Sequence, residues 1–69
     1  MSRYYSVTLD HDENDYIFKK RENADSFLWN YYMSSFPEES REQRIDAQHE
    51  LNTTSSIQGV GTIYQGWDN

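Results

Sequence analysis

Ser35-Phe36-Pro37-Glu38 is the stretch that decides how the helical part of the chain is divided. A serine three residues before a glutamate matches the capping box at a helix N-terminus, and proline is tolerated in the first turn of a helix. The motif therefore predicts that one helix ends near residue 34 and that a second helix covers residues 36–51. Glu38 would lie in the first turn of that second helix, where a negative charge is stabilising.

The residues before this motif have the spacing of a helix that faces a core. Apolar residues recur there every three or four positions, which predicts a first helix over residues 24–34 with Asn23 as its N-cap. The residues with this spacing are Ala24, Phe27, Leu28, Tyr31 and Tyr32. The second helix has few apolar residues, so we expect much of its surface to be exposed.

Strand-forming residues occupy both ends of the chain. Residues 3–9 and 16–21 flank the polar segment 10–15 and predict a β-hairpin, and residues 57–65 predict a third strand. We therefore expect a single small α+β domain over residues 1–69, with the order β-β-α-α-β. It would have a three-stranded sheet in the order 2-1-3, the last strand parallel to the first, and a helix pair packed on one face.

The composition indicates a folded, acidic protein. The 69 residues include 12 Asp and Glu against 6 Lys and Arg, a net charge of −6, and no cysteine, so disulfides and thiolate metal sites are excluded. Two Trp, six Tyr and three Phe supply apolar area for a small core. We find no signal peptide and expect a cytoplasmic protein, in the host cytoplasm if a phage encodes it. The negative charge disfavours direct binding to nucleic acid or membrane and favours a partner with a basic surface.

Acidic residues fall at intervals of four across the predicted second helix: Glu38, Glu42, Asp46 and Glu50. In a helix they would form one slowly turning stripe, with about 6 Å between neighbours along the axis. Each neighbouring pair would destabilise the helix by about 0.2–0.5 kcal/mol. One interpretation is an ordinary solvated helix face whose repulsion nearby arginines soften. The other is a partner-binding row of carboxylates that takes the place of DNA phosphates on a DNA-binding protein.

The predicted hairpin turn carries a second acidic cluster, made of Asp10, Asp12, Glu13 and Asp15. It is either a soluble turn that protects a sheet edge or a second row of the same partner-binding surface. The first positions match the calcium ligands of an EF-hand loop, but Asp15 replaces the required glycine and Arg21 replaces the bidentate glutamate. We therefore expect no metal site.

Apolar side chains on the first helix offer a different interface. Trp29, Met33 and Phe36 lie on a second face of that helix and would form the contact surface of a homodimerising adaptor or regulatory protein-interaction domain. Tyr4 and Tyr64 would lie on the uncovered face of the sheet, where tyrosines also suit binding. In this alternative the acidic residues serve only solubility.

No catalytic or cofactor-binding pattern accompanies these surfaces. His11 and His49 are isolated in the sequence, and the segment from Gly59 to Gly61 lacks the lysine and hydroxyl residue of a P-loop. We therefore expect neither an enzyme nor a bound cofactor.

In size and charge, though in no residue motif, the chain is similar to small acidic α+β inhibitors that phages and mobile elements encode. Antirestriction, anti-CRISPR and DNA-glycosylase inhibitors are of this kind. The similarity implies a protein that blocks a nucleic-acid-binding protein by presenting a DNA-mimicking carboxylate surface. A further alternative is a regulatory protein that binds a host transcription or replication factor without mimicking DNA.

Overall fold

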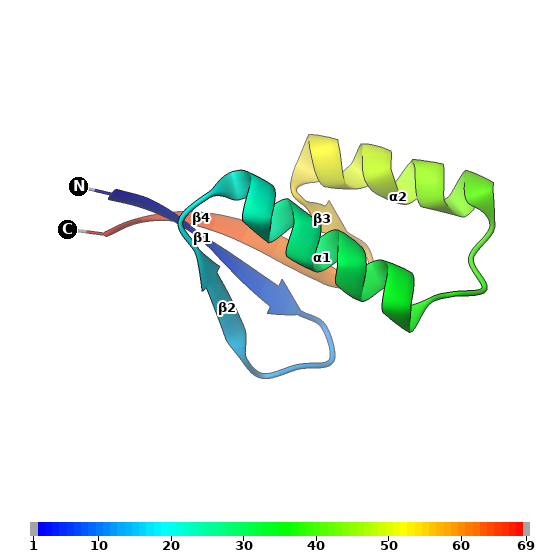
Figure 1. Ribbon diagram of the computed structural model, residues 1–69, viewed down its shortest axis with the longest axis horizontal. Coiled ribbons are helices and arrows are strands. Elements are labelled where there is room, and N and C mark those ends of the chain that lie inside the picture. The colour runs from blue at the N-terminus through cyan, green and yellow to red at the C-terminus, as the bar shows by residue number, and fades with distance from the viewer. Residues whose placement is uncertain (1, 69) are drawn as a thin grey trace.

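The computed structural model describes residues 2–68 and, apart from that of Asp68, their side chains (Figure 1). This part of the chain forms two helices and a four-stranded sheet. The elements in chain order are β1 (Ser2–Leu9), β2 (Asp15–Phe18), α1 (Arg21–Ser35), α2 (Arg41–Thr54), β3 (Ser56–Ile57) and β4 (Gly61–Asp68). The strand order is β2-β1-β4-β3, and every neighbouring pair is antiparallel. The α+β class is confirmed, and the sheet has one strand more than expected.

One face of the sheet forms the core. Tyr5, Val7 and Leu9 are buried and alternate with more exposed residues along β1, as a strand with one covered face requires. In Figure 1, α1 crosses this face and α2 lies beside it, next to β3. The same apolar cluster takes in, from the other elements, Ala24, Leu28, Tyr32, Ala47, Leu51, Ile57, Val60 and Ile63. Both helices therefore pack on the same face.

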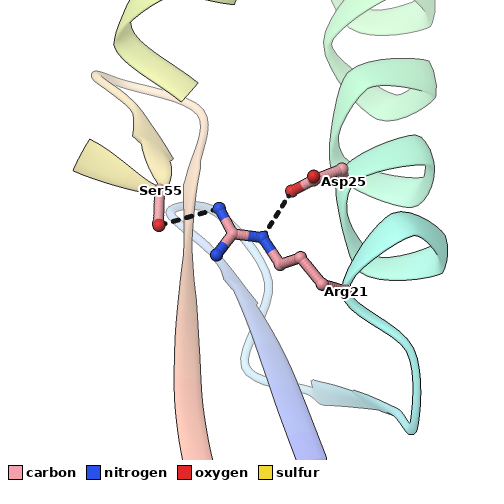
Figure 2. A network of polar contacts seen from close by, with 3 residues as sticks. All are labelled: Arg21, Asp25 and Ser55. Carbon is pink, nitrogen blue, oxygen red and sulfur yellow. Dashed lines mark hydrogen bonds and ion pairs between the residues drawn. The ribbon is translucent and has the colours of Figure 1, made fainter. Parts of the chain in front are cut away.

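The first helix begins earlier than predicted. α1 starts at Arg21 with Lys20 as its N-cap, so the prediction of Asn23 as the N-cap is wrong. Lys20 makes no side-chain capping hydrogen bond. Instead, the Arg21 guanidinium donates to Asp25 and to the Ser55 hydroxyl, each at 2.8 Å (Figure 2). Because Ser55 is the C-cap of α2, these contacts join the start of α1 to the end of α2.

The boundary between the helices also differs from the prediction. The Ser40 hydroxyl accepts from the Gln43 N–H at 3.2 Å, and the Gln43 side chain accepts from the Ser40 N–H at 2.8 Å, so the capping box of α2 lies here. The predicted capping box at Ser35 is wrong. It would need Phe36 to be helical, and a following Pro37 disfavours that conformation. Phe36 instead has φ −129° and ψ 63° and ends α1.

The predicted C-terminal strand is two strands joined by a turn. The Val60 N–H donates to the Ile57 carbonyl at 2.9 Å, and Gly59 has a φ of 78°, a region that glycine adopts without steric cost. This turn reverses the chain, so β4 runs antiparallel to β1 along its whole length. The predicted position beside the first strand is correct, whereas the predicted parallel direction is wrong.

Within residues 2–68, neither helix covers the opposite face of the sheet, which we call the open face. Its side chains come from Tyr4, Ser6, Thr8, Ile17, Thr62 and Tyr64. Ile17 and Tyr64 are 59% and 57% exposed. The Tyr4 ring lies over Gly66, where a Cβ would clash with it. The expected placement of Tyr4 and Tyr64 on an uncovered face is confirmed.

Candidate functional site

The acidic stripe is shorter than the sequence predicts, because Glu38 lies in the connection between the helices and not in α2. The three remaining members are on α2, where Glu42 and Asp46 are exposed and Glu50 is half-buried. A helix turns about 100° per residue, so successive members are rotated by about 40° around the axis. Glu42 consequently faces solvent, whereas Glu50 reaches the β3–β4 turn and accepts from the Gln58 N–H at 3.0 Å.

Part of the second acidic cluster holds the β1–β2 loop together. One Asp12 oxygen accepts from the backbone and side-chain N–H groups of Asn14, each at 3.0 Å, and the other accepts from the Tyr16 hydroxyl at 2.6 Å. The Tyr16 bond is the main reason why the pKa of Asp12 is lowered and the pKa of Tyr16 is raised. Asp15 accepts from the Thr8 hydroxyl at 3.1 Å. These two aspartates therefore have local structural roles.

The other two acids of that loop, Asp10 and Glu13, have exposed side chains. Within residues 2–68, neither side chain takes part in a hydrogen bond or a salt bridge. They are the members of the cluster that are free to meet a partner.

The β3–β4 turn brings the two acidic segments together. On one side of this turn, the Asp10 N–H donates to the Val60 carbonyl at 2.9 Å. On the other side, the Gln58 N–H donates to the Glu50 carboxylate at 3.0 Å. Asp10, at the start of the β1–β2 loop, and Glu50, near the end of α2, therefore flank one turn, although they are far apart in the sequence. The sequence gives no sign of this juxtaposition, because it depends on the turn that divides β3 from β4.

A hollow of about 270 Å³ lies between α2 and the end of α1. Three carboxylates line it, those of Glu39, Asp46 and Glu50, together with the buried Tyr32. Burial raises the pKa of the Tyr32 hydroxyl, the negative charge of Glu39 raises it further, and Arg44 opposes the shift. Glu39 thus adds a carboxylate to the α2 acids. We define the acidic surface as Asp10, Glu13, Glu39, Glu42, Asp46 and Glu50.

Within residues 2–68, no carboxylate of the acidic surface has a salt-bridge partner. Within residues 2–68 there is one salt bridge, between Arg21 and Asp25, and it lies outside the acidic surface. Arg3 stacks on Trp67, with its guanidinium carbon 4.8 Å from the ring centroid. Arg44 donates to the Met33 sulfur and to the carbonyl of Pro37, both at 3.1 Å. Its guanidinium therefore lies at the connection between the helices, which also carries Glu39, and within residues 2–68 it makes no salt bridge with a carboxylate.

The proposed aromatic interface of α1 is half-buried. Trp29, Met33 and Phe36 all pack against the core cluster. The rings of Trp29 and Phe36 lie 5.2 and 5.9 Å from the ring of Tyr32. These side chains are therefore partly covered by the core, whereas Ile17 and Tyr64 on the open face are exposed.

The structure offers no metal cluster or membrane span in the part that it describes. Within residues 2–68, no three His, Cys, Asp or Glu side chains are arranged to hold a metal ion. Neither α1 nor α2 is long and apolar enough to cross a bilayer. No protein-family model, curated protein or solved structure shows a significant match to this chain.

Proposed function

We propose that this protein binds a basic, nucleic-acid-binding surface of another protein and blocks it, by presenting carboxylates where the nucleic acid presents phosphates. The observation that carries the proposal is the meeting of two acidic segments around the β3–β4 turn, through the bonds Asp10 to Val60 and Gln58 to Glu50. Two separate groups of carboxylates on a small protein are a feature that folding does not need, since like charges repel.

The charge density of the acidic surface suits a partial imitation of a duplex. Carboxylates at every fourth residue of α2 are spaced by about 6 Å along the axis, compared with about 3.4 Å per phosphate along the axis of one DNA strand. One row therefore supplies roughly half the linear charge of a strand, and the loop acids add to it. The net charge of −6 would accelerate the encounter with a basic partner.

An apolar residue lies among the charges of α2. Ile45 is 46% exposed and, at three residues from Glu42, shares the outward face of the helix. Protein interfaces usually combine a central apolar contact with a polar rim. Ile45 would supply such an apolar contact. A helix face that served only solubility would not need an exposed isoleucine among its charges.

Glu42 and Asp46 are the residues on which to test the proposal. Both are exposed, and within residues 2–68 neither side chain takes part in a hydrogen bond or a salt bridge. Glu50 and Asp12 are unsuitable, because their carboxylates hold the β3–β4 turn and the β1–β2 loop.

The experiment is an affinity capture from a bacterial lysate with the wild type, the E42K/D46K double variant and E22K as baits. We expect a DNA-binding protein that the wild type and E22K retain at low salt, that high salt or added duplex DNA releases, and that the double variant fails to hold. Retention by the double variant, or resistance to elution by DNA, would contradict the proposal. Circular dichroism of each bait controls for folding.

The second candidate is an adaptor or regulatory domain that binds its partner through the open face. The observation in its favour is the exposure of Ile17 and Tyr64, at 59% and 57%, on a sheet face that neither helix covers. Under this alternative, replacing both residues by serine abolishes capture of the partner. The E42K/D46K variant would then bind as the wild type does, and binding would be insensitive to salt.

A further inference from the structure

The outer edge of β4 is longer than the strand that covers it. β4 pairs with β1 from Gly61 to Asp68, whereas β3 pairs only with Gly61 and Thr62. One more bond, from the Ile63 N–H to the Ser55 carbonyl at 2.7 Å, extends the covered part of this edge. Within residues 2–68, no further strand lies along residues 64–67.

The direction of the Ile63 bond shows which backbone groups of this edge point outward. In an antiparallel sheet, alternate residues direct both their N–H and their C=O to the same side. Ile63 points away from β1, so Gln65 and Trp67 do so as well, and Tyr64 and Gly66 point toward β1. The outer edge therefore presents the N–H and C=O groups of Gln65 and Trp67 to a further strand.

This edge lacks the devices that keep sheet edges from pairing. Natural proteins protect an edge with short strands, charged side chains or proline. The opposite edge is protected in this way, because β2 has only four residues, begins with Asp15 and is followed by Lys19. The four residues 64–67 of β4 are Tyr-Gln-Gly-Trp, without a charge or a proline, and the one charged residue of this strand is Asp68, at its end.

We propose that a second copy of this chain pairs with the outer edge of β4, antiparallel and about a two-fold axis at Gly66. In this register Gln65 of each copy lies opposite Trp67 of the other, so all outward N–H and C=O groups of these residues form hydrogen bonds. Centring the axis on Gln65 would instead place Trp67 opposite Ile63, whose N–H is already bonded to Ser55. The register centred on Gly66 therefore pairs the outward N–H and C=O groups of Gln65 and Trp67 without competing with the Ile63–Ser55 bond.

A second copy fits this edge for two reasons. A two-fold contact brings identical residues together, and this is harmless here because residues 64–67 are uncharged. The acids that give the chain its net charge of −6 lie mostly elsewhere, on the β1–β2 loop and α2, away from the chain termini in Figure 1. Trp67, which is 56% exposed, would gain cover from Gln65 of the other copy. This inference goes beyond the proposed function and does not depend on it.

The contact is a single strand pair, smaller than the roughly 800 Å² per partner of a stable complex, so we expect a weak dimer with a Kd of about 0.1 mM. The first measurement is sedimentation of the wild type from about 10 μM to about 1 mM. The second is amide exchange by NMR over the same range. With that Kd, about a fifth of the chains stay monomeric at about 1 mM, so exchange at Gln65 and Trp67 slows about fivefold. The Gly66 N–H, bonded to β1, stays protected at all concentrations.

Gln65→Pro is the decisive variant, because it removes an outward N–H and leaves the ladder with β1 intact. Gln65→Ala is its matched control, since it loses the side chain but keeps that N–H. We expect Q65A to dimerise as the wild type does and Q65P to be monomeric. A wild type that stays monomeric with concentration-independent exchange at Gln65 and Trp67, or a Q65P that still dimerises, would overturn the proposal. If Q65P fails to fold, the exchange data on the wild type decide.

Discussion

The position of the capping box of α2 can be tested with two serine variants. Ser40→Ala removes the hydroxyl that accepts from the Gln43 N–H at 3.2 Å, and it leaves that N–H without its partner at the start of α2. Ser35→Ala changes the serine of the box that the sequence predicts. Ser35 is the exposed last residue of α1, and within residues 2–68 its side chain makes no hydrogen bond.

The expected difference between these variants is large for a protein of this size. Loss of an N-cap hydroxyl costs about 1 kcal/mol of unfolding free energy, within a range of about 0.5–2 kcal/mol. A domain of this length has a total stability of roughly 3–10 kcal/mol. The melting temperature should therefore fall by about 4–8 °C in Ser40→Ala. Ser35→Ala should change the unfolding free energy by less than about 0.5 kcal/mol, as exposed residues without partners usually do.

Urea denaturation followed by circular dichroism measures both values. An unchanged m-value would show that the two variants unfold from the same compact state. Gln43→Ala is a useful third variant, since it removes the reciprocal bond to the Ser40 N–H at 2.8 Å. If Ser35→Ala costs more than Ser40→Ala, α2 begins earlier than described, and Glu38 returns to the acidic stripe.

Two further predictions concern the open face and the β1–β2 loop. Gly66→Ala should cost about 0.5–1.5 kcal/mol of unfolding free energy, because its Cβ pushes the half-exposed Tyr4 ring out of its preferred rotamer. The cost should shrink in a Tyr4→Ala background, and additive costs would contradict this contact. Since the pKa of Asp12 is lowered in the folded state, this group adds stability above its ordinary pKa of 3.8, and that stability is lost as the pH falls through the lowered value. Tyr16→Phe removes the main cause, so an NMR titration should show the Asp12 pKa rising toward 3.8, and an unchanged pKa would refute the role of this bond.

The strand pattern of the N-terminal hairpin was predictable because it is local. Tyr5, Val7 and Leu9 alternate along β1 and face the core, as their spacing requires. The apolar spacing of α1 predicts Ala24 and Leu28 as buried residues for the same reason. Burial on one side of a regular element leaves its period in the sequence.

The helix boundary was not predictable from the capping motif alone, because the sequence contains two such motifs. Both Ser35 to Glu38 and Ser40 to Gln43 have a serine followed three residues later by Glu or Gln. The choice between them depends on Pro37, which disfavours the helical backbone that the first motif needs at the preceding residue. A capping motif must therefore be read together with the residue that precedes any proline inside it.

The arrangement of the acids around the β3–β4 turn also could not be predicted from the sequence. The reversal at Gly59 lies inside the stretch 57–65 that the sequence predicts as one strand, and the bond from Val60 to Ile57 and the φ of 78° at Gly59 reveal a turn. That turn sets the direction of β4 and brings Asp10 and Glu50 to its two sides. Residue types indicated which acids to consider, whereas their common surface depends on tertiary contacts between distant segments.

The most direct test of the acidic surface compares Glu42→Lys with Glu22→Lys. Both glutamates are exposed, and each is the second residue of a helix that begins with arginine, so the two variants share the same change in charge and in helix-dipole interaction. The measurement is the Kd of each variant, at low and high salt, for the DNA-binding protein recovered by capture. We predict that E42K weakens binding about fivefold or more at low salt and that E22K stays within about twofold of the wild type. Equal losses in the two variants would show that only net charge matters and would contradict the acidic surface as the contact.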